Sequence, residues 1–442
     1  MKRNQWLTAL ALGLGLGLTL TLLWLLARQP DIARADPDIL FVAADGNDTN
    51  DCSTIANRCR TVQRAVDLAA DSATIKVATG IYTDTDMIAA MGYVVVLTKT
   101  VTLRGGYDAS FADPPDPNAN PTTLDAQDAG RVLSISGAGP TIEGLIITGG
   151  YGDYSGGGIK VEGASPIISD SLIVGNSADG DGGAIFVNGG SAQILNNRII
   201  DNIATWAGGL RIINDADVTI VGNEIVSNVA QISGGGIDLE CCGGTTPLIA
   251  QNLIAYNDGG TFGGGVKVDA THGRLVNNIL ARNQADDGAG IWLDGMVSYP
   301  VSTTLIHNTW VGDPAGGEGV WVGSYVTATL VNNIIVSHTT GITNTVPTSS
   351  TVTADYSLFD GNGIDYGSGV SSTNEVSGDP AFVAPATDDY HIGSGSAAID
   401  AGVGVGVTDD IDGDPRPVGL APDIGADEFA PRIYLPLVLK QY

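Results

Sequence analysis

Apolar and polar residues alternate in short blocks along most of the chain, and the same order of blocks recurs from about residue 140 to residue 336. Each unit contains a short apolar strand, an asparagine, a second short strand, another asparagine, a loop, two or three glycines and a third strand. One unit reads PLIAQNLIAYNDGGTFGGGVKVDATH. Alternation within each strand predicts one buried and one outward face. The repeat therefore predicts a solenoid with three short strands in each coil.

The first asparagine of each unit marks the length of a coil. It recurs at steps of 26, 29, 26, 30 and 25 residues, at Asn197, Asn223, Asn252, Asn278, Asn308 and Asn333. Coils of a parallel solenoid stack at about 4.8 Å, so the side-chain amides of successive asparagines can hydrogen-bond. We expect these residues to be structural and to adopt the left-handed backbone of a tight corner. The glycines before the third strand supply another sharp bend.

This pattern resembles the right-handed parallel β-helix of the pectate-lyase-like superfamily, and the resemblance covers roughly residues 38–429. It implies an all-β solenoid with three short strands per coil, about ten coils and a short N-terminal capping helix. Members of this superfamily include polysaccharide lyases and hydrolases. The sequences GGAI at 182–185 and NSA at 176–178 also resemble repeats of polymorphic outer-membrane surface proteins.

The chain divides into five segments. A basic start, an apolar run over residues 7–26 and a small-residue motif before Asp36 indicate an export signal, which would act as a membrane anchor if it were not cleaved. The predicted segments are a signal at 1–35, an N-terminal cap with the first coils at 36–100, β-helix repeats at 101–380, a C-terminal capping segment at 381–429 and an apolar tail at 430–442.

The four cysteines fit an oxidising compartment. Cys52 and Cys59 flank a short polar loop, and we expect them to form a disulfide. The adjacent Cys241 and Cys242 could form a vicinal disulfide, bind a metal or lie in a turn, and the turn is favoured. Just after the first pair, Thr61 is placed to cap a helix that has one apolar stripe.

The composition is that of a turn-rich β protein, with 61 glycines, 43% hydrophobic residues and 16% charged residues. The formal net charge of −29 disfavours nucleic acid and anionic lipid as partners. We expect an exported, extracellular or surface-held monomer. Its membrane contact would be restricted to the N-terminal segment, if that segment is not cleaved.

Alternation on the third strand predicts which side chains face outward. The first outward column contains Lys160, Phe186, Arg211, Asp238, Lys267, Trp292 and Trp321, and the second contains Glu162, Asn188, Ile213, Glu240, Asp269 and Asp294. Aromatic rings stack on sugar faces and carboxylates accept hydrogen bonds from sugar hydroxyls. The candidate ligand-binding residues are therefore Lys160, Arg211, Glu240, Trp292, Asp294 and Trp321.

Two reactions fit the same face, with Asp238, Lys267 and Asp269 as candidate catalytic residues. A lyase would use Lys267 or Arg211 as its base, with calcium held by Asp238, Glu240 and Asp269. A hydrolase would use Asp238 and Asp269 as a carboxylate pair. Ordinary charge pairing across neighbouring strands is the structural alternative. Our leading prediction is a secreted or surface β-helix protein that presents a glycan-binding or adhesive face to an extracellular glycan or surface polymer, with a lyase or glycoside hydrolase as the alternative.

The C-terminal segment places one base, Arg416, among Asp410, Asp412, Asp414, Asp423, Asp427 and Glu428. We expect an internal ion pair there, with calcium as the alternative because the first three aspartates are spaced as in a calcium loop. Pro415 and Ala421 stand where an EF-hand needs glycine and glutamate. The four histidines share no metal-ligand spacing, so no histidine metal site is predicted.

Overall fold

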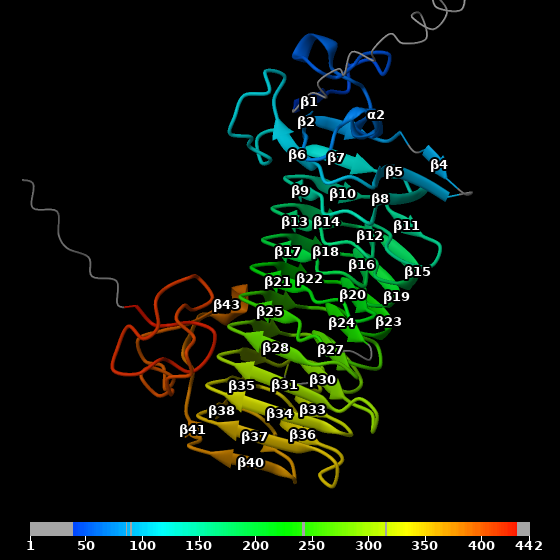
Figure 1. Cartoon of the computed structure of the whole chain (residues 1–442). Coiled ribbons are helices and arrows are strands. Elements are labelled where there is room, and N and C mark those ends of the chain that lie inside the picture. The colour runs from blue at the N-terminus through cyan, green and yellow to red at the C-terminus, as the bar shows by residue number, and fades with distance from the viewer. Residues whose placement is uncertain (1–38, 85, 89–90, 241–243, 314–315, 431–442) are drawn as a thin grey trace, which may run out of the picture.

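The computed structural model describes residues 39–84, 86–88, 91–240, 244–313 and 316–430. The chain forms a parallel β-solenoid of about 11 turns, which confirms the predicted fold class (Figure 1). The predicted signal at 1–35, the Cys241–Cys242 pair and the tail beyond residue 430 lie outside the described residues. No helix within the described part of the chain is long and apolar enough to span a membrane.

Three long sheets run the length of the solenoid, and each coil contributes one strand to each sheet. The first sheet contains β1 (Ile39–Val42), β2 (Thr74–Ala78), β6 (Thr102–Tyr107), β9 (Thr141–Glu143), β13 (Ile167–Ser169), β17 (Gln193–Leu195), β21 (Thr219–Val221), β25 (Leu248–Ala250), β28 (Gly273–Val276), β31 (Val301–Ile306), β34 (Val326–Val331), β37 (Thr351–Asp355) and β40 (Val370–Thr373). The second contains β3 (Gly80–Tyr82), β7 (Thr122–Asp125), β10 (Ile146–Thr148), β14 (Leu172–Val174), β18 (Arg198–Ile200), β22 (Glu224–Val226), β26 (Leu253–Ala255), β29 (Ile279–Ala281), β32 (Thr309–Val311), β35 (Ile334–Val336), β38 (Leu358–Asp360) and β41 (Val376–Ser377). The third contains β4 (Asp86–Ile88), β5 (Met91–Leu97), β8 (Gly130–Ser136), β12 (Ile159–Glu162), β16 (Ile185–Asn188), β20 (Leu210–Ile213), β24 (Ile237–Glu240), β27 (Val266–Asp269), β30 (Ile291–Asp294), β33 (Glu318–Val322), β36 (Thr340–Asn344) and β39 (Ile364–Tyr366).

A fourth sheet lies beside the third, where four successive coils bulge outward before their glycines (Figure 1). We call it the side sheet, and it contains β11 (Tyr151–Gly152), β15 (Ser177–Asp181), β19 (Ile203–Trp206) and β23 (Val229–Ser233). The remaining described elements are the helices η1 (Ile55–Asn57), α2 (Val62–Leu68) and η2 (Pro385–Thr387), and the antiparallel pair β42 (Phe382–Ala384) and β43 (Asp389–Ile392).

The core consists of columns of aliphatic residues stacked in register from coil to coil. In the third sheet Ile237 pairs with Val266, which pairs with Ile291, and all three side chains are fully buried. Each of these core side chains thus packs against its counterparts on the neighbouring coils. A slip of one residue would turn every core side chain outward, so this burial fixes the register.

The repeated asparagines form a buried ladder along the junction of the first and second sheets. Asn252 accepts hydrogen bonds from the backbone and side-chain nitrogens of Asn223, at 2.8 and 3.0 Å. It donates to the side-chain oxygen of Asn278 and, at 2.9 Å, to the carbonyl of Ile220. The same pattern joins Asn197, Asn223, Asn252, Asn278, Asn308 and Asn333. A second ladder runs through Asn176, Asn202, Asn228, Asn257 and Asn283.

The left-handed backbone lies one residue earlier than the sequence suggested. Gln251, Asn277 and Asn332 have φ of 55°, 53° and 57°, and each directly precedes a ladder asparagine. The expectation that the ladder asparagines themselves adopt this conformation was wrong. The sharp bend belongs to the residue whose side chain points out of the corner, because the ladder side chain must point inward to reach the next coil.

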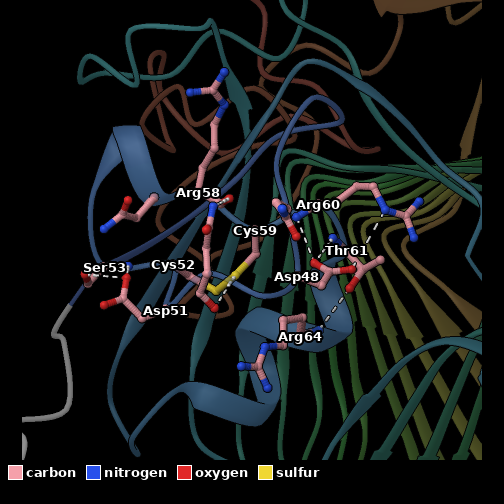
Figure 2. The surroundings of a disulfide bond; sticks show 12 residues. Asp48, Asp51, Cys52, Ser53, Arg58, Cys59, Arg60, Thr61 and Arg64 are labelled. Carbon is pink, nitrogen blue, oxygen red and sulfur yellow. Dashed lines mark hydrogen bonds and ion pairs between the residues drawn. A yellow bond between two sulfur atoms is a disulfide. The ribbon is translucent and has the colours of Figure 1, made fainter.

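The N-terminal cap is held by the predicted disulfide between Cys52 and Cys59 (Figure 2). The cysteine segments border β1, since the backbone of Phe41 donates to Cys52 and accepts from Cys59. Next to the bridge, Asp48 accepts hydrogen bonds from the backbone nitrogens of Arg60 and Thr61, at 2.8 and 2.9 Å. Thr61 then caps α2 by accepting from the backbone of Arg64, as predicted.

The C-terminal segment, residues 381–429, folds back along the solenoid and covers the outer face of the second sheet (Figure 1). Tyr390, Ile392 and Ile424 lie in one apolar cluster with residues of β29, β32, β35 and β38. The left-handed corner residues also bind this segment. Asn277 donates to the carbonyl of Asp409 at 2.6 Å, and Asn332 donates to the carbonyl of Val403 at 2.8 Å.

Replacing one ladder asparagine should destabilise the solenoid. Asn252→Ala leaves buried partners on both neighbouring coils without hydrogen bonds, and we expect a loss of about 2–4 kcal/mol. The matched control is Asn188→Ala, because Asn188 also bonds to the neighbouring coils, through Glu162 and Asn214, but is half-buried and has partners that water can reach. Urea unfolding followed by circular dichroism measures both variants, and equal shifts of their midpoints would contradict a structural role for the ladder.

Candidate functional site

The first outward column of the third sheet is turned away from the solenoid core but is not open to solvent. Asp238 is 0% exposed, Phe186 is 4% exposed, and Arg211, Lys267 and Trp292 are each 6% exposed. The prediction that this column faces solvent was therefore wrong for these five residues. Only Lys160 and Trp321, near the two ends of the column, remain half-buried.

The cover is supplied by the last residue before the glycines of each coil. Asp181 at the end of β15 contacts Arg211, and Ser233 at the end of β23 donates to Asp238 at 2.7 Å. One coil further on, the ring of Phe262 lies 5.2 Å from that of Trp292. Sequence reasoning missed these covering residues. Their constant position before the glycines was the available signal.

The glycines let the chain return closely over the sheet. Gly263 has a φ of 63°, and a Cβ added there would lie 2.8 Å from the carbonyl oxygen of Val266. A Cβ on Gly264 would lie 2.4 Å from the carbonyl oxygen of Gln284. A larger residue would therefore push the covering segment away from the column beneath it.

Arg211 lies at the centre of a buried charge cluster that spans four coils. Its guanidinium is 3.1 Å from Asp181, 2.6 Å from Asp238 and 2.5 Å from Glu240. Lys267, two coils after Arg211, is 3.2 Å from both Glu240 and Asp269 and 3.7 Å from Asp238. The structure thus brings together five of the candidate residues predicted from the sequence, with Asp181 as an added member.

The cluster holds both of its bases in the charged form. Burial opposes the charge of Lys267, but Asp238, Glu240 and Asp269 outweigh burial and raise its pKa. The pKa of Arg211 is raised in the same way by Asp238, Glu240 and Asp181. A protonated lysine with a raised pKa is a poor proton acceptor. The geometry therefore favours ion pairing over the predicted role of a lyase base.

The pKa values of the carboxyl groups in the cluster depend on burial and on the nearby cations. Desolvation raises the pKa of Asp181 and that of Asp269, despite the nearby cations. Burial also opposes the ionised form of Glu240, but Lys267 and Arg211 together lower the pKa of this side chain. Glu240 is also the most exposed member of the cluster, with 38% of its side chain accessible.

The predicted calcium site does not fit this arrangement. Asp238 has no exposed surface, and Arg211 and Lys267 already contact the carboxylates that would hold the ion. Asp238 is also enclosed beneath Ser233, so the predicted Asp238–Asp269 pair has one member that a polysaccharide cannot reach without displacing the cover.

Beyond the charge cluster the column continues as an aromatic stack. The rings of Trp292 and Trp321 lie 5.1 Å apart and are nearly parallel, at 10°. On the coil before Trp292, the ammonium of Lys267 lies 5.7 Å from the ring of this tryptophan. Trp292 is thus fixed between neighbours, and Trp321 carries the accessible part of the stack.

The second outward column forms the accessible surface of the third sheet. Its members Glu162, Asn188, Ile213, Glu240, Asp269 and Asp294 are all half-buried. Lys160 lies apart from the charge cluster and pairs with Glu162 on its own strand, at 2.8 Å. Asp294, next to the tryptophan stack, accepts a hydrogen bond from the backbone of Ser324. We call this column the outer row.

The C-terminal segment contains the expected ion pair. The side chain of Arg416 is 0% exposed, contacts Glu428 at 3.0 Å and donates to the carbonyls of Asp423 and Gly425. The carboxylate of Asp410, the first position of the calcium-like sequence, accepts hydrogen bonds from the backbone nitrogens of Asp412 and Asp414. Asp410 therefore shapes a turn.

Comparisons with known proteins identify the same fold. A family model described as a right-handed β-helix region matches residues 123–285 and, in an overlapping second match, residues 183–378. The crystal structure of pectate lyase Pel9A is 15% identical, with 89% of this chain and 96% of that chain covered, at a TM-score of 0.61. The A-module of the Azotobacter vinelandii mannuronan C-5 epimerase AlgE6 is 13% identical, with coverage of 78% and 90%, at a TM-score of 0.40. No curated protein matches the chain.

Removing the buried lysine should destabilise the fold in a pH-dependent way. Lys267→Met leaves three carboxylates without their shared cation, and we expect a loss of about 3–5 kcal/mol at pH 7. The loss should shrink as the pH falls towards 4, because the buried carboxylates, including Asp269 with its raised pKa, can then be neutralised by protons. Thermal unfolding across this pH range measures the effect.

The matched control is Lys160→Met, since Lys160 is half-buried and its pair with Glu162 is accessible to water. Its loss should stay below about 1 kcal/mol at every pH. Equal losses for the two variants, or no pH dependence for Lys267→Met, would contradict a buried charge cluster.

Proposed function

This chain belongs to the family of right-handed β-helix proteins, and on that premise we propose that it is an exported protein that binds a neutral polysaccharide along the third sheet. The observation that carries the proposal is the accessible edge of the tryptophan stack beside the outer row. Trp321 is half-buried and held against Trp292, and the carboxylates of Glu240, Asp269 and Asp294 are half-buried on the preceding coils.

The chemistry of this surface suits a sugar chain. An aromatic ring offers a flat apolar face to a pyranose, while carboxylates accept hydrogen bonds from sugar hydroxyls. Stacking fixes Trp321 before a ligand arrives, so little conformational entropy would be lost on binding. Successive coils repeat the outer row at about 4.8 Å, which gives an extended ligand contacts along its length.

The charge of the protein selects the kind of polysaccharide. At −29 the chain repels polyanions at long range, and the outer row adds local negative charge. A neutral glycan avoids this repulsion. The pectate lyase whose fold resembles this chain is named for a polysaccharide substrate, and that resemblance favours a glycan as the partner class.

Export is supported by the apolar N-terminal pattern and by the disulfide between Cys52 and Cys59. We propose that the protein acts as a monomer outside the cell or at its surface, where an adhesive role would follow from glycan binding. A lyase or hydrolase that uses the Arg211–Trp321 face remains the alternative outcome of the experiment. The burial of Asp238 and the raised pKa of Lys267 disfavour it.

Truncation of the accessible tryptophan should weaken glycan binding. Trp321→Ala removes the stacking surface, and we expect at least a tenfold loss of affinity, about 1.4 kcal/mol, for the neutral polysaccharides that bind. Isothermal titration calorimetry against a panel of soluble neutral and acidic polysaccharides measures it. The control is Trp206→Ala, because Trp206 is also half-buried but lies in the side sheet.

The same mixtures should be assayed for new reducing ends and for the absorbance of unsaturated products. Binding without products, lost in Trp321→Ala and kept in Trp206→Ala, is the expected result. Products would establish the enzymatic alternative, and the absence of binding by folded protein across the panel would overturn the proposal.

A further inference from the structure

The C-terminal segment brings together three potential metal ligands from separate parts of its sequence. His391 lies on β43, Asp412 lies in the turn shaped by Asp410, and Asp427 lies near the end of the segment. One ligand atom of each residue lies within 4.8 Å of those of the other two. In Figure 1, β43 lies on the flank of the solenoid where this segment folds back.

The imidazole is oriented for metal binding. Its Nδ1 lies 2.6 Å from a carboxylate oxygen of Asp389, and its Nε2 lies 2.8 Å from a carboxylate oxygen of Asp412. A carboxylate that accepts the Nδ1 proton fixes the ring and leaves Nε2 free to bind a metal, an arrangement typical of protein zinc sites. Sequence spacing alone does not place Asp389 in this supporting role.

Hydrogen bonds that involve the backbone position both residues that supply the carboxylate ligands. The nitrogen of Asp412 donates to Asp410 at 2.9 Å, which fixes the turn, and Asp427 accepts from the nitrogen of Ile392 at 2.7 Å. Asp427 is buried, whereas Asp412 and His391 have 56% and 39% of their side chains exposed. One fixed ligand and two accessible ones let an ion enter and draw the group together.

The surroundings leave negative charge uncompensated. Asp389, Asp412 and Asp427 surround a single imidazole, while the nearby Arg416 is directed at Glu428 and two backbone carbonyls. The group opens into a cleft of about 770 Å³, which is also lined by Ser394 and Phe429. The cleft provides access for an ion and room for the water molecules that would complete its coordination.

We propose that His391, Asp412 and Asp427 bind a divalent transition-metal ion of the zinc type, with Asp389 as the positioning residue for the imidazole. One nitrogen and two carboxylate oxygens match the ligand preference of such ions, whereas calcium prefers oxygen ligands only. Bonds of about 2.0–2.2 Å in a tetrahedral site place ligand atoms about 3.4 Å apart, so the widest pair would have to close by up to about 1.4 Å. The ion would cross-link three parts of the segment that covers the second sheet.

The test uses the purified full chain after treatment with EDTA and its removal, titrated with zinc chloride alone. We expect one ion per chain with a Kd in the micromolar range or below, and an increase in the melting temperature. His391→Gln and Asp412→Asn should each weaken binding at least tenfold. Asp389→Asn should weaken it by about 10–100-fold through loss of the ring's orientation.

The control is Asp414→Asn, which removes a carboxylate that lines the same cleft without belonging to the ligand group. Its affinity should stay within threefold of the parent. Asp412 is exposed, so Asp412→Asn keeps the test informative if His391→Gln fails to fold. No zinc binding, or equal affinity in the parent and both ligand variants, would overturn the proposal, as would equal affinity for calcium. None of these readouts depends on glycan binding.

Discussion

Each coil of this protein stacks on the next in register, residue upon residue, and this stacking determines both the core and the outward surface. Stacking places Ile237, Val266 and Ile291 in one buried column, and it places Asn223, Asn252 and Asn278 within hydrogen-bond reach of one another. A buried asparagine with unmet hydrogen bonds is costly, so every coil must supply the next rung of the ladder. Apolar burial and polar pairing thus enforce the same register.

The same register determines what the outward residues can do. Arg211 and Lys267 lie next to carboxylates of neighbouring coils because stacking brings them there, and the segments around the glycines then cover them. A covered pair of opposite charges is held in place and is poorly suited to bind a substrate. The accessible polar and aromatic side chains of the third sheet are those of the outer row and Trp321. Outside the solenoid, further accessible polar side chains lie in the C-terminal segment. This segment accepts hydrogen bonds from the left-handed corner residues Asn277 and Asn332.

The sequence was sufficient to predict local periodicity. Strand alternation and the spacing of the asparagines predicted the coils, and the loop between Cys52 and Cys59 predicted the disulfide. The burial of Asp238 was missed because alternation along its own strand does not show its cover, which comes from Ser233 at the end of β23 in the side sheet. Nor could the approach of His391 to Asp412 be predicted, since the return of the C-terminal segment along the solenoid is a long-range contact.

The middle of the first outward column, from Arg211 to Lys267, forms a closed charge cluster. Amine labelling of the native protein, with each lysine followed by mass spectrometry, distinguishes a closed cluster from an open groove. Lys160 has 25% of its side chain exposed and Lys267 has 7%. We expect Lys160 to react readily and Lys267 to react only after unfolding. Labelling of both at similar rates in the folded protein would show that the column is an open groove.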